Sequence, residues 1–207
     1  MKSLKIIFGL LVACLLVPCA SADIMADVRL NTAALIGGTT GPYYLEFQLV
    51  DGDGVQNNAV TLSDFQFVGG ASTGTASLIG GAAGDLSSIV TLVDSSFFNE
   101  FYQSFIPGTE VRFKLAFTTN FIDPTPDMLS IAVLNSALLE VPTAGPGNEL
   151  ISVDLRQPIQ FNTYSGIDLG TDPVMGAPTV AAVPEPGSLI LGITMLAGCL
   201  AVRKLWR

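Results

Sequence analysis

Oxygen-bearing side chains gather in one short polar stretch, LVDGDGVQNNAV at 49–60, with the residue types of a cation-binding loop. Asp51 and Asp53 are two residues apart, and Asn57 and Asn58 follow them. Carboxylate and amide oxygens are the ligands that Ca²⁺ prefers. The stretch departs from the EF-hand pattern, because the third acidic position is missing, the glycine comes too early and no glutamate closes the loop. A turn or β-loop, for which Asp, Gly and Asn supply the geometry, is therefore favoured over a calcium site.

Enzymatic chemistry has few suitable groups in this sequence. The chain contains no histidine, which removes Ser-His-Asp catalysis and the usual imidazole base or metal ligand. No glycine motif for phosphate or dinucleotide binding is present. Two carboxylates alone can serve a glycosidase, and Glu46 lies beside aromatic residues, but a solvent-facing glutamate is its ordinary explanation. We therefore predict a non-enzymatic protein without a cofactor.

Tyrosine side chains offer a different kind of site, because an aromatic face can stack on a sugar ring. Tyr43, Tyr44 and Tyr102 are the candidate platforms. They support an alternative prediction, in which the chain is a carbohydrate-binding module of an exopolysaccharide or biofilm matrix.

One segment, DSSFFNEFYQSFIPG at 94–108, has the spacing of a helix. Its aromatic residues recur at i, i+1, i+4, i+5 and i+8. Asp94 or Ser95 supplies an N-cap, and Pro107-Gly108 supplies a stop. The pattern predicts a short helix, which more often covers the open end of a β core than binds a sugar.

Charge is divided unevenly along the chain. The net charge is −9, yet five of the nine basic residues lie in the two ends, whereas 23–182 holds every acidic residue except Glu185. A region this acidic repels nucleic-acid phosphates and anionic lipid heads, so we exclude nucleic acid as a partner. All three cysteines also lie in the ends, which removes a thiol nucleophile or thiolate metal site from the central region.

The central region alternates apolar and polar residues in short runs separated by Gly, Pro, Asn and Asp, as strands do. The runs are 24–30, 43–50, 59–68, 87–93, 109–119, 128–134, 149–155 and 158–165. About eight strands at this spacing predict a mainly β fold, an antiparallel β-sandwich or jelly roll with the one short helix. We place this domain at 23–169. The Gly-rich stretch 69–84 is predicted as a long loop with a weak central strand, and 170–182 as an extended tether.

The first 22 residues have the three parts of a secretory signal peptide. MKSLK is a positive n-region, 6–17 is an apolar h-region, and Ala20 and Ala22 occupy the −3 and −1 positions of a cleavage site. Cleavage is expected after Ala22. The rival interpretation, a lipoprotein box ending at Cys14, is disfavoured because it would cut the apolar run short. Signal peptidase is therefore the predicted partner at this end.

The last 25 residues, VPEPGSLILGITMLAGCLAVRKLWR at 183–207, combine a Pro-Glu-Pro triplet, an apolar run and a basic end. The run 187–202 carries no charge and is marginally short for a membrane helix, which needs about 20 residues. Arg203, Lys204 and Arg207 form a basic stop that belongs on the cytoplasmic face. We therefore predict a transmembrane helix that anchors the chain transiently in the inner membrane.

This ordered combination resembles the PEP-CTERM sorting domain of Gram-negative bacteria. Val183-Pro184-Glu185-Pro186, Gly187-Ser188, the apolar stretch and the basic cluster match it over the whole tail, with Cys199 inside the span as the one departure. The resemblance implies processing by an exosortase near Pro184-Glu185-Pro186 and delivery to the cell surface or an exopolysaccharide matrix. YYLEFQL, NNAVTLSDF and FFNEFYQSF in the remainder resemble a group of PEP-CTERM proteins with a β-rich domain, which implies boundaries and fold but no activity. We accordingly expect an exported surface or matrix protein.

Overall fold

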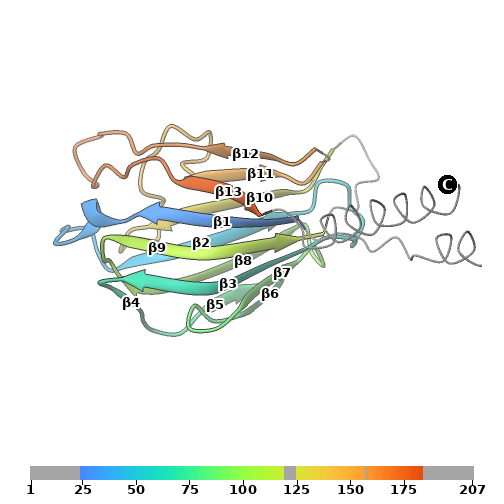
Figure 1. The fold of residues 1–207 in the computed structure, drawn as a ribbon, viewed down its shortest axis with the longest axis horizontal. Helices are drawn as coiled ribbons and strands as arrows, with labels where there is room; N and C mark the ends of the chain where they lie inside the picture. The colour runs from blue at the N-terminus through green and yellow to red at the C-terminus, as the bar shows by residue number, and fades with distance from the viewer. Residues whose placement is uncertain (1–23, 119–124, 157, 184–207) are drawn as a thin grey trace, which may run out of the picture.

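Apolar and polar residues alternate along most of the strands, because a strand with one face on a core buries every second residue. In β9 (Glu110–Phe117), Val111, Phe113, Leu115 and Phe117 are buried and the residues between them are partly exposed. The computed structural model describes residues 24–118, 125–156 and 158–183 (Figure 1). The predicted signal peptide and the tail beyond Val183 lie outside these residues.

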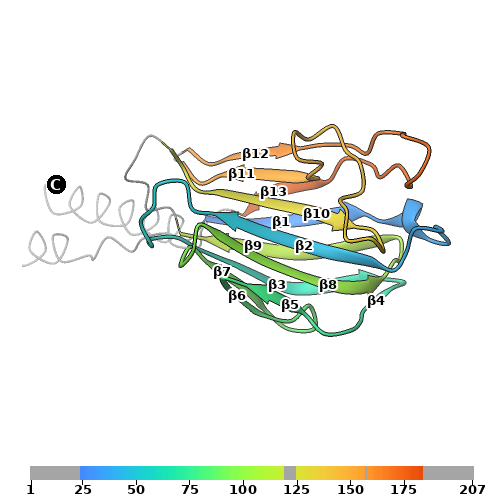
Figure 2. The same ribbon diagram turned by 180° about the vertical axis from the view of Figure 1, so that it is seen from behind.

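Two antiparallel sheets pack face to face around one core (Figure 1, Figure 2). The six-stranded sheet has the order β13-β1-β9-β3-β7-β6, with β1 (Ile24–Asn31), β3 (Ala59–Val68), β6 (Gly81–Gly84), β7 (Val90–Val93) and β13 (Thr179–Val183) beside β9. The seven-stranded sheet has the order β12-β11-β10-β2-β8-β4, with β2 (Tyr43–Val50), β4 (Ala71–Ser72), β8 (Phe98–Ile106), β10 (Met128–Leu134), β11 (Ile151–Asp154) and β12 (Gln160–Thr163), while β5 (Ser77–Ile79) pairs with β8. Helical structure among the described residues is limited to a 3₁₀ turn, η1 (Ala33–Leu35). The prediction of a mainly β fold is confirmed.

Aromatic rings from both sheets meet at the centre of the core. Phe47 of β2 is fully buried and stacks on Phe101 of β8, with ring centroids 5.7 Å apart. It also meets the edge of Phe113, across the core on β9, at 5.6 Å. Phe47 thus contacts both a neighbouring strand of its own sheet and a strand of the opposite sheet.

The helix predicted over 94–108 is wrong, because Phe98–Ile106 form strand β8 between β2 and the short strands β4 and β5. Phe101 and Phe105 are four residues apart, an even number that suits one face of a strand as well as one face of a helix. Asn99 and Gln103 occupy the inward positions beside them and are buried, which hides the apolar alternation. Hydrogen bonds satisfy both amides.

These two buried amides also order the Gly-rich segment that was predicted as a long loop. Asn99 accepts a hydrogen bond from the Gly81 N–H at 2.8 Å and donates to the Leu49 carbonyl at 3.1 Å. Gln103 accepts from the Leu86 N–H at 2.8 Å and donates to the Gly74 carbonyl at 3.2 Å. Residues 69–84 therefore contain three short strands, β4, β5 and β6, in place of one.

Strand β13 extends the six-stranded sheet into the segment predicted as a tether. It pairs antiparallel with β1, with Val183 opposite Met25 and Thr179 opposite Arg29. Because β1 is the first strand described, this pairing brings the beginning and the end of the described fold to one edge and one end of the sheet (Figure 1). Within the described ranges, no helix is long and apolar enough to span a membrane. The predicted membrane helix falls outside those ranges.

The stacked position of Phe47 leads to a stability prediction. Phe47→Ala should lower the free energy of unfolding by about 3–5 kcal/mol, because it removes a buried ring from both sheets and leaves a cavity. Phe97→Ala is the matched control, since the Phe97 side chain is 74% exposed and should change stability by less than about 0.5 kcal/mol. Urea unfolding of the two variants measures the difference, and equal effects would contradict this description of the core.

Candidate functional site

The register of two strand pairs gathers acidic residues at one end of the sandwich. Val50, the last residue of β2, lies opposite Met128, the first residue of β10, so Asp51 and Asp127 leave the seven-stranded sheet side by side. In the other sheet Ala59 lies opposite Val93, so Asn58 and Asp94 are likewise neighbours. Four strand ends from two sheets therefore deliver polar side chains to one place.

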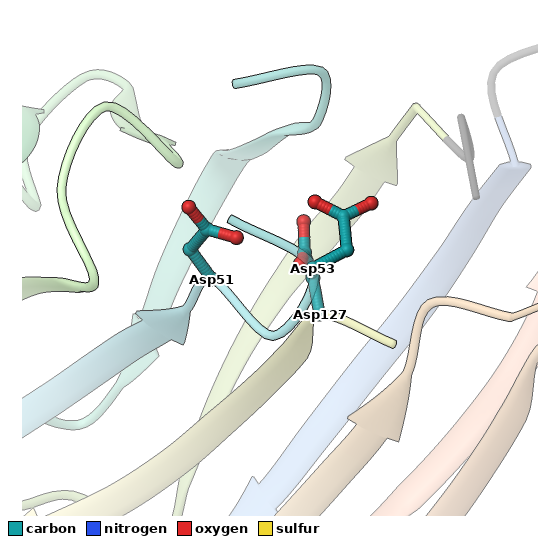
Figure 3. A group of neighbouring side chains, drawn as sticks. All are labelled: Asp51, Asp53 and Asp127. Carbon is teal, nitrogen blue, oxygen red and sulfur yellow. The ribbon is translucent and has the colours of Figure 1, made fainter. Parts of the chain in front are cut away.

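Three carboxylates of this group approach one another closely (Figure 3). Asp51, Asp53 and Asp127 each offer one oxygen, and these three oxygens all lie within 4.8 Å of one another. Asp51 and Asp53 come from the loop after β2, and Asp127 from the chain just before β10 (Figure 3). The structure thus brings together the two aspartates that the sequence suggested for calcium and adds a third from 74 residues further along the chain.

Backbone N–H groups of the loop after β2 orient the three carboxylates. The Gly54 N–H donates to Asp51 Oδ1 at 2.6 Å, and the Val55 N–H donates to Asp53 Oδ1 at 2.8 Å. The Gly52 N–H donates to Asp127 Oδ1 at 2.8 Å. A glycine is required at Gly52, because an added Cβ would stand 2.2 Å from the carbonyl oxygen of Pro126. This close approach holds the two acidic segments together.

The two asparagines of the sequence motif donate hydrogen bonds to the acidic group. Asn58 donates its side-chain N–H to Asp127 Oδ2 at 2.8 Å, and Asn57 donates to Asp53 Oδ2 at 3.2 Å. Their backbone N–H groups both donate to Asp94 Oδ2, at 2.9 Å from Asn57 and 2.7 Å from Asn58. They position carboxylates, whereas the sequence had suggested them as oxygen ligands.

Asp94 is a buried member of the group that the sequence motif did not include. Only 2% of its surface is exposed, and its Oδ1 accepts no hydrogen bond from any described residue. Burial raises the pKa of Asp94 above its ordinary value; the N–H groups of Asn57 and Asn58 oppose this, and the nearby Asp127 carboxylate adds to it. Asp94 and Asp127 could be recognised only from the strand pairing, because neither belongs to an acidic pattern in the sequence.

A second group of polar and aromatic residues lies on the outer face of the seven-stranded sheet. Tyr44, Glu46 and Gln48 alternate with core residues along β2, and Glu100 and Tyr102 do the same along β8. Glu46 lies opposite Tyr102, and Gln48 lies opposite Glu100. The five side chains form one patch, which we call the tyrosine–glutamate face.

Two of the three predicted sugar platforms belong to this face. The rings of Tyr44 and Tyr102 meet edge to face, with centroids 6.0 Å apart, and both residues are partly exposed. Tyr43 points the other way: it is buried in the core, and its hydroxyl hydrogen-bonds Thr40 Oγ1 at 2.8 Å. Tyr43 is therefore not a platform, because the period of a strand turns adjacent residues to opposite faces.

Glu46 is buried, which corrects the expectation of a solvent-facing glutamate. Only 4% of its surface is exposed, and the pKa of Glu46 is raised to about 8, first by burial and then by its hydrogen bond to Glu100 and the charge of that group. The Gln48 amide donates to Glu46 at 2.9 Å and to Glu100 at 3.3 Å. Glu46 and Glu100 thus accept hydrogen bonds from the same side-chain amide.

The remaining site residues of the sequence analysis are distributed as follows. Val183 ends β13. The other sorting and cleavage residues lie outside the described residues: Ala20, Ala22, Pro184, Glu185, Pro186, Arg203, Lys204 and Arg207.

Comparison with protein-family models, curated proteins and solved structures finds no match to this chain.

The buried Glu46 carboxyl leads to a pH prediction. Its pKa is higher in the fold than in the unfolded chain, so the favourable state is the protonated one, present at low pH and lost as the pH rises toward 8. The stability of the wild type relative to Glu46→Gln should therefore fall between about pH 4.5 and pH 8, by on the order of a few kcal/mol. Urea unfolding across this range measures it.

Glu100→Gln provides the control for this measurement. Removing the neighbouring carboxylate lowers the pKa of Glu46, because both its hydrogen bond and its charge raise that pKa. The fall in stability should then be smaller and should end at a lower pH, because only the folded-state pKa of Glu46 changes. A wild-type curve parallel to that of Glu46→Gln from pH 4.5 to 8 would show that Glu46 ionises normally.

Proposed function

We propose that this chain is an exported, non-enzymatic protein of the cell surface or extracellular matrix that is processed at both ends. Signal peptidase removes residues 1–22. The tail 183–207 then holds the chain in the inner membrane through its apolar run and its basic stop. An exosortase acts near Pro184-Glu185-Pro186 and releases or transfers the β domain. The proposed partners are therefore the two processing enzymes and, transiently, the membrane.

The observation that carries this proposal is the position of the two processing signals relative to the fold. Strand β1 begins at Ile24, two residues after Ala22, and β13 ends at Val183, the first residue of the sorting motif. Cleavage at both signals would leave every strand in place. Met25 and Val183 are paired, so both cut ends would leave the same end of the sandwich.

The charged side chains agree with a soluble cargo that avoids anionic polymers. Three of the four basic residues between 24 and 183 form ion pairs: Arg112 with Glu110, Lys114 with Asp64 and Arg156 with Asp154. Little positive charge is left to attract a phosphate backbone.

The long strands alternate between the two sheets along the chain, and we propose that this winding is jelly-roll-like.

A second function, saccharide binding, is favoured by the tyrosine–glutamate face. Sugar-binding sites combine aromatic rings, which pack on the apolar faces of a sugar, with amides and carboxyls that bond its hydroxyls. Tyr44 and Tyr102 supply the rings, and Gln48 and Glu100 supply the polar groups beside them. The predicted ligand is a neutral polysaccharide of the surrounding matrix, because an acidic one would be repelled by Glu100.

Substitution of the sorting triplet tests the first proposal. Cells that carry an exosortase and express the chain with Pro184-Glu185-Pro186 changed to alanines should keep it in the membrane fraction at unprocessed size. The wild type should reach the surface or medium in a shorter form. Leu169→Ala with Thr171→Ala, two exposed residues in the segment between β12 and β13, is the control and should behave as the wild type. Identical processing of the triplet variant would refute sorting by this motif.

Substitution of Tyr102 tests the second function. If the tyrosine–glutamate face binds saccharide, Tyr102→Ala should weaken binding about tenfold, because it removes a stacking ring worth about 1.4 kcal/mol. Phe97→Ala removes an exposed aromatic residue outside this face and should leave affinity unchanged. Isothermal titration against neutral glycans measures both. Equal losses in the two variants would indicate non-specific aromatic contact, and unchanged binding in Tyr102→Ala would exclude the face.

A further inference from the structure

We propose that Asp51, Asp53, Asp94 and Asp127 bind one Ca²⁺ ion at the end of the sandwich where strands of both sheets terminate. This inference is independent of the sorting and saccharide proposals, because it rests on four side chains that neither of them uses. It assigns a metal site to a loop that the sequence alone favoured as a turn.

The spacing of the oxygens fits this ion. Ca²⁺ binds oxygen ligands at about 2.3–2.6 Å, so two ligands on opposite sides of the ion stand about 5 Å apart and adjacent ligands stand closer. The oxygens of Asp51, Asp53 and Asp127 lie within 4.8 Å of one another. One ion can therefore contact all three without any rearrangement of the backbone.

Asp94 supplies the observation that an acidic cluster alone would lack. Its carboxylate is nearly inaccessible to solvent, and one oxygen, Oδ2, is held by two backbone N–H groups. The other oxygen, Oδ1, has no hydrogen-bond donor among the described residues, although the carboxyl group lies within hydrogen-bonding reach of Asp127. A buried carboxylate oxygen without a donor is costly. A cation beside Asp127 would remove that cost.

The surrounding donors orient the four carboxylates and leave them free to coordinate. Each accepts at least one backbone N–H, from Gly54, Val55, Gly52 or the Asn57–Asn58 pair. A carboxylate oxygen has two lone pairs, so an oxygen that accepts one hydrogen bond can still bind a metal. N–H groups are neutral and do not cancel four negative charges. Three of the basic side chains between 24 and 183 pair with other acids, at Glu110, Asp64 and Asp154.

The ligand chemistry selects calcium among the common ions. Residues 23–182 contain neither histidine nor cysteine, and without nitrogen or sulfur ligands a zinc or copper site is disfavoured. Mg²⁺ demands near-octahedral ligands at about 2.0–2.1 Å and keeps most of its waters. An all-oxygen set from an irregular loop and three strand ends suits the larger, less demanding Ca²⁺.

Calcium bound here would tie the two sheets together. Asp51 and Asp127 flank β2 and β10 of the seven-stranded sheet, whereas Asp94 follows β7 of the six-stranded sheet. Because an ion that binds only the folded chain stabilises it, unfolding should become calcium-dependent. Strand β1 begins and β13 ends at this same end of the sandwich, so the ion would secure the region from which the sorting tail departs.

Calorimetry and thermal unfolding of the purified chain, stripped with a chelator and then titrated with CaCl₂, test the proposal. We expect one equivalent of Ca²⁺ to bind, and the melting temperature to rise with calcium concentration and to fall again in excess chelator. MgCl₂ at the same concentration should give a smaller shift. Absence of binding heat together with equal melting temperatures in calcium and chelator would overturn the site, and an equal shift with Mg²⁺ would overturn the assignment to calcium.

Three variants separate a metal site from a purely structural cluster. Asp94→Asn should weaken calcium binding at least tenfold, yet in chelator it should melt at or above the wild-type temperature, because the amide removes charge repulsion and its oxygen can still accept the two N–H groups that bond Asp94 Oδ2. Asp127→Asn should weaken binding similarly, but its melting temperature in chelator should fall somewhat, because it keeps only one of the two oxygens that accept from Gly52 and Asn58. Asp53→Asn, at a less buried position, should also weaken binding and guards against a folding defect in the other two. Asp168→Asn, exposed in the loop after β12, is the control and should bind as the wild type. Unchanged calcium affinity in all three site variants would refute the proposal.

Discussion

The register of antiparallel pairing within the two sheets is the constraint on which the rest of this structure depends. Pairing of Val50 with Met128 and of Ala59 with Val93 determines which residues meet where the strands end. Pairing of Glu46 with Tyr102 determines which residues share the outer face. A shift of one residue would turn each set of side chains to the opposite face of its sheet. The packing of Phe47 on Phe101 and Phe113 opposes such a shift, because it would expose the largest rings of the core.

Strands with regular alternation were predictable from sequence, and those with buried polar residues were not. Val111, Phe113, Leu115 and Phe117 have polar or small neighbours, so 109–119 was read correctly as a strand. Strand β8 was missed because Asn99 and Gln103 face inward, where a simple pattern demands apolar residues. The hydrogen-bond partners of these two amides, among them Gly81 and Leu86, are distant in sequence. The local sequence therefore does not show that the amides can be buried with their hydrogen bonds made.

The candidate sites show the same division between local and long-range information. Asp51 and Asp53 were identified because they are close in sequence, whereas Asp94 and Asp127 reach them only through strand pairing. Tyr44 and Tyr102 were selected as aromatic residues, but the strand period alone separates Tyr44 from the buried Tyr43. The raised pKa of Glu46 comes from its burial and from the neighbouring acids Glu100 and Glu140, which lie on other segments of the chain, so the sequence alone did not reveal it. In each case the missing information was the pairing of strands.

The acidic strand ends and the tyrosine–glutamate face are the two groups of polar side chains on which the proposed binding functions rest. The domain lies between predicted processing signals that begin and end where its strands do. The claim that most distinguishes this structure from an inert scaffold is that four aspartates from both sheets surround a cation. A crystal structure of the chain grown with calcium, with an anomalous difference map, tests it most directly. We predict one peak with carboxylate oxygens at about 2.3–2.6 Å. Ordered water alone between Asp51, Asp53 and Asp127, with no anomalous peak, would contradict it.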